Sequence, residues 1–178
     1  MKLVLSPAET RVTVEVHAAG LLSAAAHDLR VAAESASGES ADGTSLSARF
    51  PIAKLRIAAS RRHGTREWHD PSRSDAADIE QRIRTEVFVG GGAGGAQVDV
   101  EGSVENGRAQ LTVRAPGGTQ RLATTVTVDT VGDKTRVRGA CDLSLRALGT
   151  GPPRVPFGAI KLQDAVHVEF DVTLSKID

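Results

Sequence analysis

The sequence predicts an all-β protein: an antiparallel barrel of eight to nine strands with one amphipathic helix. The main evidence is an alternation of apolar and polar residues that runs along almost the whole chain of 178 residues, as strands with one buried face require. A helical spacing is confined to about residues 72–85. Because so many strands could not bury their apolar faces in a flat sheet, closure into a barrel is expected.

The first two predicted strands flank a segment of small residues. Residues 11–17 place three valines on one face, and Leu29, Val31 and Ala33 repeat this pattern at period two. The segment between them has no such alternation. We therefore expect a short helical plug over about residues 20–26, between two amphipathic strands.

Further strands are predicted through the middle of the chain. Alternation continues over residues 46–50, and Pro51 is expected to kink the chain before the next strand, near residues 54–57. Short strands are also predicted over residues 86–89 and 97–101, on either side of a run of glycines.

The single predicted helix lies between these strands. Ala76, Ile79 and Ile83 recur at helical spacing, so they share one face. Ser72 offers a cap at the start, and arginines lie near the end, where they complement the helix dipole.

Turn signals separate the last strands. Asn106-Gly107 between two alternating runs predicts a type I′ hairpin, because both residues tolerate positive φ. Residues 116–118 and 132–133 predict two more turns. The final strand is the longest clean alternation, and its apolar face is formed by Val166, Val168, Phe170, Val172 and Leu174.

Two regions resemble the YceI-like family of lipid-binding barrels. The first is the predicted plug with its flanking strands, which ends in His27-Asp28. The second runs from Leu145-Arg146-Ala147-Leu148-Gly149 through a proline-rich loop into residues 156–162 and the final strand. The resemblance extends over nearly the whole chain and implies one YceI-like domain, residues 1–178, with a lipocalin-like barrel. It further implies non-catalytic binding of a long isoprenoid or fatty-acid-like lipid along the barrel axis.

The residues themselves leave the content of the barrel open. The apolar faces consist mostly of Ala, Val and Leu, and side chains of this size leave volume inside a barrel of about eight strands. One interpretation is a lipid-binding or carrier protein. The alternative is a barrel filled by its own side chains that acts as a structural or interaction protein.

His27 and Asp28 are the candidate polar residues of the lipid site. A histidine at the barrel opening could present one ring nitrogen to a lipid headgroup while the adjacent carboxylate fixes or charges the ring. The alternative is that His27 caps backbone groups of the plug. The candidate apolar lining consists of Leu22, Val14, Val168 and Phe170.

Other classes of function find little support. An enzyme that uses His27 and Asp28 is the least favoured, because no hydrolase or metal motif accompanies them, and no metal or cofactor is predicted. The glycine run of residues 90–95 is followed by a strand, whereas a dinucleotide site requires a helix there. Equal numbers of basic and acidic residues, 22 each, do not favour nucleic acid as a partner.

The sequence also bears on membranes, partners and location. No apolar run approaches the length of about 20 residues that a membrane span needs. No signal peptide is visible, so a cytoplasmic location is expected, with a periplasmic one as the alternative if the N-terminus has been trimmed. Formation of a homodimer is left open.

Overall fold

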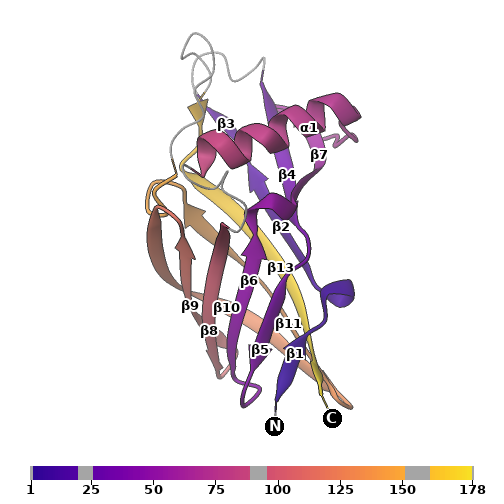
Figure 1. The fold of residues 1–178 in the computed structure, drawn as a ribbon, viewed down its shortest axis with the longest axis vertical. Helices are drawn as coiled ribbons and strands as arrows, with labels where there is room; N and C mark the ends of the chain where they lie inside the picture. The colour runs from indigo at the N-terminus through magenta and orange to yellow at the C-terminus, as the bar shows by residue number, and fades with distance from the viewer. Residues whose placement is uncertain (1, 20–25, 89–95, 151–160, 178) are drawn as a thin grey trace.

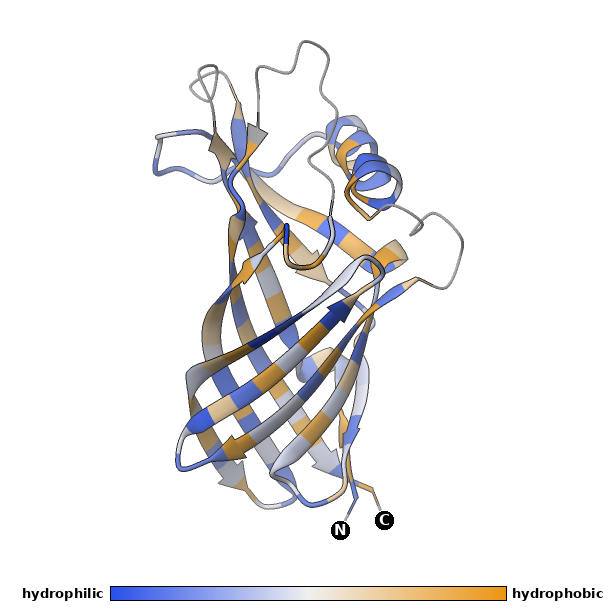
Figure 2. Ribbon diagram, turned by 90° about the vertical axis from the view of Figure 1, so that its left-hand side faces the viewer, coloured by the Kyte–Doolittle hydropathy of each residue, from blue (hydrophilic) through white to orange (hydrophobic). Residues whose placement is uncertain are grey.

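The computed structural model describes residues 2–19, 26–88, 96–150 and 161–177 of the chain. These residues form an elongated β-barrel with a helix across its upper end (Figure 1). One antiparallel sheet of 11 strands contains the barrel. Along the strands the hydropathy alternates from residue to residue (Figure 2). The predicted all-β fold is therefore confirmed.

Eight strands close the barrel, in agreement with the predicted eight to nine. In spatial order they are β1 (Leu3–Leu5), β5 (Ser37–Ser40), β6 (Ser45–Pro51), β8 (Gln97–Glu105), β9 (Arg108–Ala115), β10 (Gly118–Val131), β11 (Lys134–Ser144) and β13 (Ala165–Lys176). The ring is completed by antiparallel pairing of β13 with β1, in which Leu174 lies opposite Leu5.

Three further strands extend the wall at the upper end: β2 (Arg11–Val16), β4 (His27–Ala33) and β7 (Leu55–Arg62). They are added to β13 in that order. β13 therefore pairs with β1 near its end and with β2 nearer its start, and the 3-10 turn η1 (Pro7–Glu9) separates these two partners. The two-residue strands β3 (Ala18–Ala19) and β12 (Lys161–Leu162) pair with each other.

The predicted helix is present as α1 (Arg73–Arg82), which continues into a π-helical turn, η4 (Ile83–Val87). The Ser72 hydroxyl accepts a hydrogen bond from the Asp75 amide and so caps its start, as the sequence indicated. The Glu80 carboxylate accepts the Ile57 amide at 3.0 Å, which attaches the helix to β7.

The predicted strand over residues 86–89 is wrong for its described part. Glu86 and Val87 belong to the π-helical turn, and residue 89 lies outside the described residues. Val87 follows Ile83 by four positions, so the apolar face of the helix continues through the segment that was predicted to be a strand.

The turns agree with the sequence. Asn106 and Gly107 have φ values of 50° and 74°, as a type I′ hairpin requires. Pro51 ends β6, and a 3-10 turn, η3 (Ile52–Lys54), leads into β7. The predicted helical plug falls outside the described residues, except for Ala26, which forms a bend.

Part of the barrel interior is packed by side chains of β1, β6 and β13. This core consists of Leu3, Leu5, Ala36, Ala48, Val172 and Leu174, and Val12, Leu46, Phe50 and Phe170 pack against it. Within the described residues, no helix is both long and apolar enough to cross a membrane.

Candidate functional site: a cavity inside the barrel

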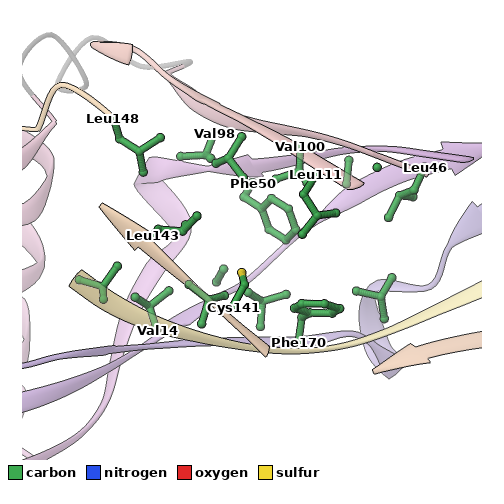
Figure 3. A pocket seen from close by; sticks show the side chains of 18 of the residues that line it. Val14, Leu46, Phe50, Val98, Val100, Leu111, Cys141, Leu143, Leu148 and Phe170 are labelled. Carbon is green, nitrogen blue, oxygen red and sulfur yellow. The ribbon is translucent and has the colours of Figure 1, made fainter. Parts of the chain in front are cut away.

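A cavity of about 270 Å³ lies inside the barrel. Seven strands line it with alternate residues, because every second side chain of a barrel strand points inward, and β7, β10 and β12 contribute one residue each. Figure 3 shows side chains from opposite walls that point toward each other across this space. The lining includes Val14, Val31, Val98, Leu111, Cys141 and Val168.

Three segments outside the strands complete the lining, and one of them is Gly43-Thr44, just before β6. Ile83, Val87 and Phe88, at the end of the helix, face the cavity. Leu148, in the turn after β11, is buried and points into it (Figure 3). None of the described residues that line the cavity is charged. An apolar group can therefore enter without burying a charge of the protein.

Three of the four predicted apolar site residues border the cavity, and their contact with a ligand stays a prediction. Val14 of β2 and both Val168 and Phe170 of β13 line the cavity. Leu22 lies outside the described residues. Cys141 also lines the cavity, and burial raises the pKa of its thiol to about 11, with a further contribution from Asp142. The thiol is therefore neutral near pH 7.

His27 and Asp28 begin strand β4 and point to opposite faces of it. His27 is exposed and is not part of the cavity lining, whereas Asp28 is only 1% exposed. Asp28 shares its face with Arg30, while Leu29 faces the cavity. The β4 backbone therefore separates the Asp28 carboxylate from the cavity, and the role of His27 toward a lipid headgroup stays a prediction.

The Asp28 carboxylate accepts hydrogen bonds from two neighbouring segments, residues 17–18 and residues 61–63. Its Oδ1 atom accepts the Ala18 amide at 3.1 Å and His63 Nδ1 at 2.7 Å. Its Oδ2 atom lies 3.1 Å from Arg61 Nε and 3.2 Å from His17 Nδ1. These contacts join β4 to β7 and to the chain between β2 and β3.

Arginine and tryptophan cover this network. The Arg61 guanidinium carbon lies 4.4 Å from the centre of the Trp68 ring, and that of Arg30 lies 4.2 Å from it. Both distances are typical of cation–π contacts. Arg30 also donates to Glu15 at 2.8 Å. We call Asp28 and its partners His17, Arg61, His63 and Trp68 the Asp28 cluster.

The cluster keeps Asp28 ionised. Burial raises the pKa of this carboxyl, but hydrogen bonds from His63, the Ala18 amide, His17 and Arg61 together outweigh burial and lower the pKa to about 2. A buried carboxylate with this many donors is typical of a structural tie between strands.

Solved structures of two other proteins have a similar fold. No protein-family model and no curated protein matches the sequence. Among solved structures, a polyisoprenoid-binding domain from Saccharophagus degradans implicated in plant cell wall breakdown is similar over 98% of both chains, with a TM-score of 0.65 and 9% identity. BcnA of Burkholderia cenocepacia is similar over 95% of this chain and 98% of its own, with a TM-score of 0.61 and 12% identity. The chain has the YceI-like barrel fold.

Sequence reasoning missed most of the Asp28 cluster. Arg61 lies directly opposite Asp28 in the β4–β7 pair. That register depends on a β-bulge beside Arg30, which the sequence pattern does not predict. The only usable signal was the period-two recurrence of Arg61 and His63, which lay beyond the strand predicted near residues 54–57. The described residues contain no group of three or more side chains placed to hold a metal ion.

Proposed function

We propose that the protein binds the apolar chain of one lipid, isoprenoid or fatty-acid-like, inside its barrel and does so without catalysis. The observation that carries this proposal is the cavity of about 270 Å³ with its uncharged lining. Burial of apolar surface contributes roughly 25 cal/mol per Å², so a chain that fills the cavity needs no covalent or ionic anchor. A similar fold in a polyisoprenoid-binding domain supports the same proposal.

A barrel filled by its own side chains, acting as a structural or interaction protein, is the alternative. The core around Leu3 and Leu5 fills part of the interior in this way. The cavity that remains open to Val14, Leu143 and Val168 favours the ligand-holding interpretation.

Mass spectrometry of an organic extract of the purified protein tests the proposal directly. We expect one dominant lipid with a long apolar chain, in an amount close to that of the protein. An extract without such a lipid, together with failure to bind added fatty acids or prenols, would contradict the proposal.

Cys141 offers a second test because it is the only cysteine of the chain and it lines the cavity. A bound lipid should shield this thiol, so adding a long-chain alcohol should slow its reaction with a small, uncharged disulfide reagent. Equal reaction rates with and without the alcohol would show that the alcohol does not occupy the cavity.

Val168→Trp should block the cavity. Val168 is buried and lines it, so an indole ring at this position takes the space of a ligand. We expect the variant to lose binding of a fluorescent fatty acid by more than it loses thermal stability. Val128→Trp is the matched control, because Val128 is 42% exposed on β10 and does not line the cavity. A Val168→Trp variant that binds as well as wild type would remove this residue from the site.

A further inference from the structure

We propose that Gly139 determines how deep a lipid chain can enter the barrel, because it gives the Phe170 ring a place against the wall. This inference rests on the proposed function. Gly139 of β11 lies directly opposite Phe170 of β13. Its neighbours at period two, Val137 and Cys141, both line the cavity, so a side chain at position 139 would also point inward.

The Phe170 ring occupies the space that a side chain at position 139 would need. A Cβ atom built on Gly139 would lie 2.7 Å from Phe170 Cζ, which is closer than real Cβ contacts come. The same Cβ would lie 3.0 Å from a methyl group of Val126 on the neighbouring strand β10. Because Val126 lies on the side toward β10, we expect a displaced Phe170 ring to move away from the wall, toward the centre of the cavity.

The ring faces two other large side chains across the cavity. Figure 3 shows Phe170 on the wall opposite Phe50 and Leu111. We call these three residues the waist. The lining continues below it to Leu46 and Val172. A chain that passes the waist can therefore reach this lower part, whereas a ring pushed inward would confine the chain to the part above.

Affinities for a series of saturated straight-chain alcohols, lengthened two carbons at a time, test this inference. In wild type, each added methylene should raise the affinity about fourfold until the chain fills the accessible cavity, after which the affinity levels off. In Gly139→Ala the affinity should level off at a chain several carbons shorter. Binding of the shortest alcohols should be unchanged, which a general loss of folding would not produce.

A second substitution at Phe170 shows whether Gly139→Ala acts by displacing the Phe170 ring or by a general disturbance of the barrel. Phe170→Leu in the Gly139→Ala background should restore the longer limit, and Phe170→Leu alone should leave the limit at wild-type length or extend it. Val128→Ala is the control, because Val128 is 42% exposed on β10 and does not line the cavity. This control should keep the wild-type limit.

The outcomes are distinguishable. If wild type binds no alcohol of any length, the proposed function fails. If wild type binds but folded Gly139→Ala has the same limit, or the double variant stays short, the role of Gly139 is overturned. If Gly139→Ala does not fold, Phe170→Leu alone decides: a shorter limit in that variant contradicts the waist.

Discussion

The two faces of strand β4 differ in what lies against them. On the inner face, Leu29 and Val31 border a cavity whose described lining carries no charge. On the outer face, one peptide unit away, Asp28 is buried among two histidines, an arginine and a backbone amide. The inner face leaves space that a ligand can fill. The outer face leaves none, because each Asp28 oxygen already has its donors.

The comparison teaches that a buried polar residue beside a cavity does not have to serve the ligand. Ala18 and His17 approach Asp28 from the chain after β2, while Arg61 and His63 approach from the end of β7. The carboxylate thus ties both neighbours of β4 at the end where the wall leaves the closed barrel. Changes on the outer face should alter stability, and changes on the inner face should alter binding.

Asp28→Asn is expected to have the largest effect. An amide cannot accept from all the donors around Asp28, and Arg61 would lose its buried partner. We expect the free energy of unfolding to fall by about 3 kcal/mol, as measured by chemical denaturation. Asp142→Asn is the control, because Asp142 pairs with His167 at 2.8 Å on the exposed surface, where such pairs contribute about 1 kcal/mol or less. Equal losses in the two variants would remove the distinction between the buried and exposed pairs.

Low pH should reduce the stability of the folded protein by protonating Asp28. The pKa of Asp28 falls from 3.8 to about 2 on folding, so the folded state favours the ionised form. Its stabilisation, about 2 kcal/mol, is present above pH 4 and is lost as the pH falls toward 2. Unfolding curves across this range should show a steeper pH dependence for wild type than for Asp28→Asn. Parallel curves would show that Asp28 is not the group responsible.

His27→Gln is expected to have the smallest effect, and it distinguishes the two roles considered for this residue. If the ring contacts a lipid headgroup, lipid affinity should weaken by about 1–2 kcal/mol, while the exposed position leaves the melting temperature close to wild type. A lower melting temperature with unchanged lipid affinity would instead assign His27 to capping of the chain before β4. Both quantities should be measured on the same preparation.

The fold could be predicted because its hairpin turn, its strand alternation and its helix cap each depend on residues close together in the sequence. Asn106 and Gly107 adopt the positive φ values that their hairpin requires, and the apolar phase of β13 faces the cavity as its alternation indicated. Ser72 caps α1 as expected. Glu86 and Val87 were wrongly predicted to be in a strand because a short apolar run has no period of its own, and the preceding helix determines its shape.

The site was less predictable because it depends on which strands are neighbours. Val14 and Val168 could be predicted as cavity residues from alternation alone. The burial of Asp28 could not, because its partners come from residues 10 to 35 positions away in the sequence. The contact of Phe170 with Gly139 likewise exists only because β11 and β13 pair in one register.

Closure of the barrel through β1 and β13 has a consequence for how the protein folds. The seam pairs Leu3 with Lys176 and spans only three residue pairs, so almost the entire chain forms the loop that this contact closes. Such long-range contacts are formed late, since the loss of chain entropy precedes their gain. Refolding should therefore be slow, with this seam among the last parts to acquire protection from hydrogen exchange. Because the seam brings the first and last strands side by side, a circular permutant that joins them and opens at the exposed Gly132 turn should fold to the same barrel faster.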